Sequence, residues 1–230
     1  MKKISRRSFL YAGAAMGAAL ALSACGANAG SGSGASQAGQ ARTVRPLPGT
    51  LSVDALDDCT FAAGFTAPDV YLDDDGALVA QLEVFDYERF DAVDIAALAP
   101  GDTLVIDGRE MAVQTVEASG SGWYEINGGL EEGGCYLACG EDGGTFYQVL
   151  EDDARSYFSL GTATLRISQE FVYTDTSDLE QPARTLYAGD FLQEMEQAAA
   201  DGVEINCTPY CVTATTQGGW LTAIDKRFAP

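Results

Sequence analysis

Glycine-rich turns divide this chain into short runs in which apolar and polar residues alternate. Asp73-Asp74-Asp75-Gly76, Asp107-Gly108 and Gln217-Gly218-Gly219 each separate two such runs. Successive side chains of a strand point to opposite faces of a sheet, so a two-residue period indicates a half-buried strand. Residues that tolerate positive φ between two strands indicate a hairpin. The sequence therefore predicts a mainly β fold, either an antiparallel sandwich or a partly open barrel built from hairpins.

Two helices are expected within this fold. One covers residues 190–200, where Asp190 is placed to cap the first turn and Asp201-Gly202 to end the last one. A minor helix near residues 94–98 begins at Asp94 and stops before Pro100-Gly101.

Residues 1–24 have the organisation of an export signal peptide. Four basic residues within the first seven positions precede a mildly apolar run from Phe9 to Leu22. A basic segment, a short apolar segment and small residues at a cleavage point are the three parts of a secretory signal. This apolar run is rich in alanine and glycine, whereas a permanent membrane span needs roughly 20 strongly apolar residues.

Two motifs refine this prediction. The run Ser5-Arg6-Arg7-Ser8-Phe9-Leu10 resembles the twin-arginine export motif, and its matching residues are Arg6, Arg7, Phe9 and Leu10. The run Leu22-Ser23-Ala24-Cys25 resembles the lipobox of bacterial lipoproteins. The resemblance implies that Cys25 becomes the new amino terminus and carries acyl chains such as palmitate, which hold it on the outer face of the cytoplasmic membrane. The alternatives are a general secretory signal with a chance arginine pair and an ordinary signal that ends before a cysteine.

The rest of the chain divides into a tether and a folded part. Residues 25–50 consist largely of glycine, alanine, serine, glutamine and proline, a composition that predicts a flexible segment. Residues 51–230 contain enough apolar residues for a core and are expected to form a single all-β domain.

The charge of the exported part restricts its partners. Nine basic and 34 acidic residues follow Cys25, which gives a net charge of −25. Nucleic acids and anionic lipid surfaces are polyanions that such a chain repels. The expected partners are the membrane, through the lipid anchor only, and an extracellular protein or glycan.

The absence of histidine restricts the chemistry. Lys226 is also the one lysine beyond the signal. Ser-His-Asp catalysis, Cys-His catalysis and histidine-ligated zinc are therefore excluded. A mechanism that uses carboxylates alone, as in glycoside hydrolysis, is compatible with the sequence. No catalytic residue is assigned and no cofactor is expected.

Five cysteines remain beyond Cys25, and four of them form two C-x3-C pairs. The pairs are Cys135 with Cys139 and Cys207 with Cys211. Secreted thiols tend to oxidise, so we expect these four residues to form disulfides and Cys59 to remain free. Residues i and i+4 of a strand lie about 13 Å apart, too far for a bridge, so bridges between the pairs are expected if both lie on strands. A turn around Pro209 would instead allow a local bridge. A four-thiolate metal site and a redox-active pair are the alternatives.

The acidic turn Asp73–Gly76 is a candidate calcium loop. With Asp73 and Asp75 as ligands in an EF-hand register, the first and last ligand positions fall on Tyr71 and Leu82, which cannot bind calcium. An ordinary hairpin turn is therefore predicted, with an irregular calcium loop as the alternative.

Four stretches beyond the tether carry a further resemblance. They are Leu98–Ile106, Ile126–Leu130, Phe171–Asp175 and Phe228–Pro230. They resemble uncharacterised lipoproteins of anaerobic Gram-positive bacteria, and this resemblance implies a shared fold and no particular activity. The sequence thus predicts a membrane-anchored extracytoplasmic lipoprotein with a non-enzymatic binding or interaction domain. A carboxylate-based hydrolase of polysaccharide and a structural envelope component are the alternatives.

Replacing Cys25 by serine tests the lipid anchor. Without the acylated thiol, we expect the protein to leave the membrane fraction, and mass spectrometry should find acyl chains on the wild-type residue only. Cys139→Ser is the matched control and should stay with the membrane. An unmodified full-length wild-type chain in the cytosol would contradict the prediction.

Overall fold

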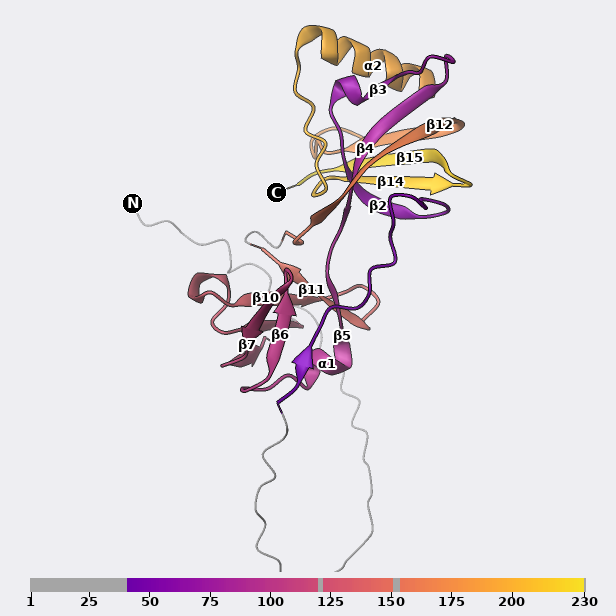
Figure 1. The fold of residues 1–230 in the computed structure, drawn as a ribbon. Coiled ribbons are helices and arrows are strands. Elements are labelled where there is room, and N and C mark those ends of the chain that lie inside the picture. The colour runs from indigo at the N-terminus through magenta and orange to yellow at the C-terminus, as the bar shows by residue number, and fades with distance from the viewer. Residues whose placement is uncertain (1–40, 120–121, 151–153, 230) are drawn as a thin grey trace, which may run out of the picture. The chain divides into compact units, whose positions relative to one another are not determined.

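The computed structural model describes residues 41–119, 122–150 and 154–229 of the chain. The predicted signal peptide, Cys25 and most of the predicted tether lie outside the described residues. Residues Gln40–Pro230 belong to one compact unit, whose strands form three sheets. Figure 1 shows these sheets with two helices. The fold is mainly β, as the sequence predicts.

Five strands of the largest sheet form a partly closed barrel. They are β2 (Thr60–Gly64), β4 (Leu78–Asp86), β12 (Phe158–Thr176), β14 (Val212–Gln217) and β15 (Trp220–Arg227). The sheet places them in the order β12-β15-β14-β2-β4, and an additional pairing between β12 and β4 brings the two ends together. The ring closes because β12 is long: its first half pairs with β4 and its second half with β15.

The barrel has a distinctive topology. If its strands are numbered one to five along the chain, the order around the ring is 1-2-3-5-4. The third and fifth strands, β12 and β15, are parallel, whereas every other neighbouring pair in the ring is antiparallel. A parallel pair requires a long crossover, which here runs through β13 (Arg184–Tyr187), α2 (Ala188–Asp201) and β14.

Helix α2 covers one part of the barrel core. Its Phe191 is fully buried and packs against Phe65, Phe171 and Tyr173 with ring-centroid distances of 6.3, 5.2 and 4.9 Å. Alternate residues of the strands, such as Leu82 on β4, supply the rest of the core. The short strand β3 (Val70–Leu72) and the 3-10 helix η2 (Ala67–Asp69) connect β2 to β4.

The segment between β4 and β12, together with β1 from the start of the described chain, forms a second group of strands with its own core. An antiparallel sheet contains β5 (Arg89–Asp91), β8 (Val116–Ala118), β9 (Trp123–Ile126), β10 (Cys135–Cys139) and β11 (Thr145–Val149). A smaller sheet contains β1 (Thr43–Val44), β6 (Thr103–Ile106) and β7 (Arg109–Ala112). Helix α1 (Ala92–Ala96) and the 3-10 helix η3 (Leu130–Glu132) complete the segment. Phe90, Ile95 and Leu137 are fully buried in this core, which is separate from the barrel core.

Most expected elements are confirmed, with local corrections. The hairpins around Asp73–Gly76, Asp107-Gly108 and Gly218-Gly219 are present. Helix α2 ends at Asp201 with Gly202 in the left-handed conformation, but it begins at Ala188, so Asp190 lies in its first turn and is not its cap. Helix α1 begins earlier than expected because the carboxylate of Asp91 accepts a hydrogen bond from the Val93 backbone N–H (2.7 Å).

The folded part also begins before residue 51. Thr43 and Val44 pair with β6 in parallel, and Val44 is buried. Arg42 adds to this attachment of β1, because its backbone N–H donates a hydrogen bond to the carboxylate of Asp102 (2.8 Å). Residues 43–50 are thus not part of a free tether. Within the described part of the chain, no helix is long and apolar enough to cross a membrane.

Truncation of Phe191 tests the barrel core. Phe191→Ala removes a fully buried ring and should lower the free energy of unfolding by about 3–5 kcal/mol in denaturant titrations. Leu179→Ala, at an exposed loop position, should change it by less than about 0.5 kcal/mol. Equal effects of the two substitutions would contradict this assignment of the core.

Candidate functional site

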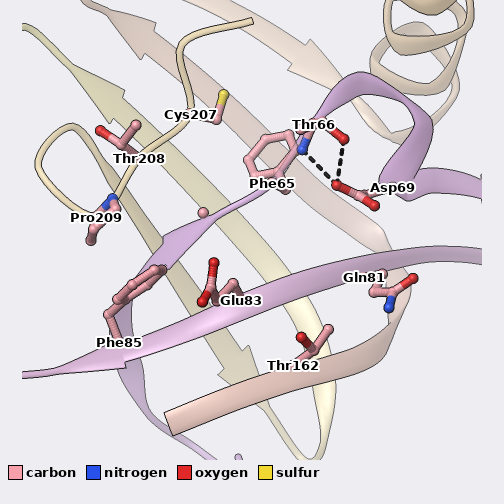
Figure 2. Close-up of a pocket in the computed structure, with 11 residues that line it drawn as sticks. Phe65, Thr66, Asp69, Gln81, Glu83, Phe85, Thr162, Cys207, Thr208 and Pro209 are labelled. Carbon is pink, nitrogen blue, oxygen red and sulfur yellow. Dashed lines mark hydrogen bonds between the residues drawn. The ribbon is translucent and has the colours of Figure 1, made fainter. Parts of the chain in front are cut away.

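A groove of about 410 Å³ lies on the barrel. Its lining residues come from β2, β4, β12, the turn after β2 and the loop before β14, and Figure 2 shows them around the groove. They are Gly64, Phe65, Thr66, Asp69, Gln81, Glu83, Phe85, Thr162, Cys207, Thr208 and Pro209. This volume is in the range that holds a small organic ligand. We refer to these residues as the barrel groove.

The floor of the barrel groove is the outward face of three paired strands. Glu83 on β4 lies opposite Gly64 on β2 and opposite Thr162 on β12. Because side chains alternate along a strand, Gln81 and Glu83 face outward while Leu82 and Val84 enter the core. The alternation that builds the barrel therefore also places these polar groups in the groove.

Glycine at position 64 keeps the floor open. A β-carbon there would lie 3.3 Å from the Phe85 ring and 3.5 Å from the carbonyl oxygen of Cys207. Any larger side chain would enter the space between Phe85 and the loop before β14.

Two connecting segments form the walls. The Phe65 backbone N–H donates to the Cys207 carbonyl (3.2 Å), which fixes the loop of residues 207–209 above the end of β2. On the other side, the carboxylate oxygen Oδ2 of Asp69 accepts hydrogen bonds from the backbone N–H (2.7 Å) and hydroxyl (2.6 Å) of Thr66. Both bonds appear in Figure 2. The hydrogen bonds from Thr66 therefore hold the Asp69 carboxylate within its own turn, and the backbone hydrogen bond of Cys207 holds the opposite wall in place.

Glu83 differs from Asp69 in having no partner. Its carboxylate forms no hydrogen bond or ion pair with any described residue, and its exposed side chain lies in the groove beside Phe85 (Figure 2). The Gln81 amide and the Thr162 hydroxyl are likewise without a described protein partner. These three groups are free to bind a ligand.

The barrel resembles an oligonucleotide/oligosaccharide-binding (OB) fold in its topology. That fold is a five-stranded, partly open barrel that binds its ligands on the face of its second and third strands, beside the loop between its first and second strands. The corresponding parts here are β4, β12 and the segment containing Thr66 and Asp69, which line part of the barrel groove, whereas the loop between β14 and β15 does not line it. The similarity concerns fold and position alone, because one fold supports many functions.

The expected disulfides are absent from the structure. All five described cysteines are free. Cys135 and Cys139 lie at the two ends of β10, where a strand separates them too far to bridge. Cys135 belongs to the core of the inserted segment, while Cys207 and Cys211 belong to the barrel core, so the two pairs are not brought together for disulfides or for a four-thiolate metal site.

Cys207 and Cys211 lie on either side of the expected turn around Pro209. The Cys211 backbone N–H donates to the Thr208 carbonyl (3.0 Å), and the Cys211 sulfur accepts from the Thr208 backbone N–H (3.4 Å). Cys59, the thiol expected to be free, is half-buried beside Thr216 (3.4 Å between Sγ and Oγ1).

The acidic turn is built as a hairpin. Oδ1 of Asp73 accepts hydrogen bonds from the backbone N–H groups of Asp75 (3.0 Å) and Ala77 (2.8 Å). The guanidinium of Arg166 lies 3.8 Å from carboxylate oxygens of Asp73 and Asp75, so both carboxylates already face a positive charge. The described residues contain no group of three or more His, Cys, Asp or Glu side chains arranged to hold a metal ion.

A second polar cluster surrounds Arg155. Its guanidinium lies over the rings of Tyr87 and Tyr147, at 4.2 Å from each centroid, and Arg89 lies over the Tyr87 ring at 4.0 Å. Arg89 is also paired with the buried Asp86 (2.9 Å). The neighbouring cavity of about 270 Å³ is lined by both arginines and by Glu141 and Asp142, a balanced set of charges. Because the ring faces already hold cations, this cluster is best explained as a packing device.

The sequence alone did not identify the barrel groove. Gln81 and Glu83 are polar positions of an alternating run, a pattern that indicates a strand and does not by itself mark a binding site. The pairing of β2, β4 and β12, which joins residues far apart in the chain, assembles the site. No local pattern in the sequence marks these residues as members of one site.

Comparisons with protein-family models, with curated proteins and with solved structures found no match to this chain.

Thiol labelling tests the cysteine environments. Burial raises the pKa of Cys135 and of Cys207 to about 12, so both remain protonated and unreactive near pH 8. Exposed Cys139 should therefore be alkylated first in the native protein, as located by peptide mapping, and the two buried thiols should react only upon unfolding. Rapid native labelling of Cys135 or Cys207 would contradict these environments.

Proposed function

We propose that this chain is a lipid-anchored extracytoplasmic binding protein whose ligand occupies the barrel groove. The observation that carries the proposal is the set of polar groups without described partners, Gln81, Glu83 and Thr162, on a preformed floor beside Phe85 and Pro209. Binding sites commonly combine apolar walls with a few polar groups that orient the ligand. The position of the groove on the face used by OB barrels agrees with this proposal.

The anchor part of the proposal rests on residues 1–25. The twin-arginine motif would export the chain and the acylated Cys25 would hold it on the outer face of the membrane. Residues between Cys25 and β1 would separate the folded part from the lipid surface.

The charge of the groove argues against a nucleic acid ligand. Proteins that bind single strands in such a groove line it with basic side chains. The barrel groove contains Asp69 and Glu83, and none of its lining residues is basic.

A carboxylate-based hydrolase of polysaccharide is the second candidate, because two carboxyl groups line one groove. One of them, Asp69, is engaged by two hydrogen bonds from Thr66 within its own turn, which favours binding over catalysis. Release of reducing sugar ends from cell-wall or dietary polysaccharides, lost in both Asp69→Asn and Glu83→Gln, would select the hydrolase. Co-purification with one stable protein partner, unaffected by groove substitutions, would select a structural envelope component.

Blocking the groove tests the binding proposal. The full-length protein in detergent micelles is screened against glycans, peptides and small metabolites by thermal shift, since a ligand of the folded state raises its melting temperature. Thr162→Trp, which fills the floor, should abolish the shifts produced by true ligands. The matched control is Gln169→Trp, at an exposed position of the same strand outside the groove. Shifts that survive Thr162→Trp, or no shift with any compound, would contradict the proposal.

A further inference from the structure

We propose that the barrel groove selects an organic cation: an ammonium group carried on a small apolar or sugar-like body. This inference rests on the proposed function and specifies the chemistry of its ligand. Its basis is the unpartnered Glu83 carboxylate beside the Phe85 ring in a groove without basic residues.

The charge around the groove favours a cation. Glu83 projects into the groove and Asp69 forms part of its wall, so two negative charges face the same space. Six of the nine basic residues beyond the signal are already paired with carboxylates elsewhere. Arg155 is held between two tyrosine rings. No basic side chain of the groove lining therefore offsets the negative electrostatic potential of this acidic chain there, and that potential attracts positive ligands.

The composition of the groove favours an organic cation over a metal ion. Calcium takes six to eight oxygen ligands, whereas the free carboxylate here is Glu83 alone, and both hydrogen bonds of Thr66 engage Asp69. The ring of Phe85 lies beside Glu83 on the same outward face of β4 (Figure 2), and aromatic surfaces attract ammonium groups and pack against apolar bodies. A carboxylate beside an aromatic ring therefore suits an ammonium group that is attached to a carbon skeleton.

The groove also offers polar contacts around the cation. The Gln81 amide and the Thr162 hydroxyl lie on the same outward face as Glu83, and neither has a described protein partner. They can orient hydroxyl or amide groups of the body that carries the ammonium. An amino sugar and a lysine side chain in a peptide both present this chemistry.

Matched probes separate charge from shape. The full-length protein in detergent micelles is titrated by calorimetry with a glucosamine trimer and with the N-acetylglucosamine trimer, which have the same backbone but differ in charge. A second pair, acetyl-Gly-Lys-Gly-amide and acetyl-Gly-Met-Gly-amide, tests the peptide source. If the groove accepts both sources of ammonium, each cationic probe should bind at least about tenfold more tightly than its neutral partner. If it accepts only the amino sugar or only the peptide lysine, that probe alone should show the difference. A change of about tenfold is the scale of one charge-assisted hydrogen bond. Preference confined to one pair identifies the source of the ammonium.

Substitution of Glu83 tests whether its negative charge selects the cationic ligand. Glu83→Gln removes the charge without changing the shape and should weaken the cationic probe by about tenfold, to the level of its neutral partner. Glu83→Asp keeps the charge and should keep a preference for the cation. Glu170→Gln makes an equal charge change at an exposed position of β12 and should leave the affinity for the cationic probe unchanged. Circular dichroism and melting temperature are compared first, and Glu83→Ala, which also removes the charge, provides the test if Glu83→Gln does not fold.

Two outcomes overturn the inference in distinguishable ways. If the neutral trimer binds as tightly as the cationic one and Thr162→Trp blocks both, the groove binds ligands without selecting charge, and the proposed function stands. If cationic probes bind equally well to Glu83→Gln and to Thr162→Trp, or if no probe binds while other compounds occupy the groove, the selection of an ammonium is wrong. If nothing binds in the groove at all, the proposed function fails with it.

Discussion

The pairing of β12 with β4 is the interaction on which the rest of the structure depends. It joins Phe158–Arg166 to Val79–Asp86 and closes the barrel after an insertion of some seventy residues. The pairing buries Leu82, Val84, Ala163 and Leu165 on one face. On the other face it sets Glu83 beside Thr162. One register therefore fixes both the core and the floor of the groove, and a slip by one residue would exchange them.

The elements whose signals are local could be predicted from the sequence. Hairpin turns such as Asp107-Gly108, with positive φ at both residues, and the end of α2 at Gly202 need no knowledge of distant residues. The parallel pairing of β12 with β15 could not be predicted, because alternation within a strand says nothing about which neighbour it receives. For the same reason the sequence showed neither the two separate cores nor the barrel groove, whose members are far apart in the chain.

The cysteines show how compartment and geometry give different expectations. An exported chain suggests disulfides, yet Cys135 and Cys139 lie at opposite ends of one strand, and Cys207 and Cys211 flank a turn next to the barrel core. Burial gives Cys135, Cys207 and Cys211 the role of small apolar side chains, whereas Cys139 is exposed. Cys207 contributes to the groove chiefly through its backbone carbonyl, which holds the wall in place.

The edges of the large sheet are short. Strand β3 has three residues and adjoins the acidic turn, and β13 has four and begins with Arg184, which is paired with Glu194 of α2. Unpaired strand edges can pair with other copies, and short or charged edges resist such pairing. For a protein that the proposal concentrates on a membrane, neighbouring copies would repel one another and would not stack edge to edge. Crowding on the cell surface would then leave each copy separate, with its groove open to the surroundings.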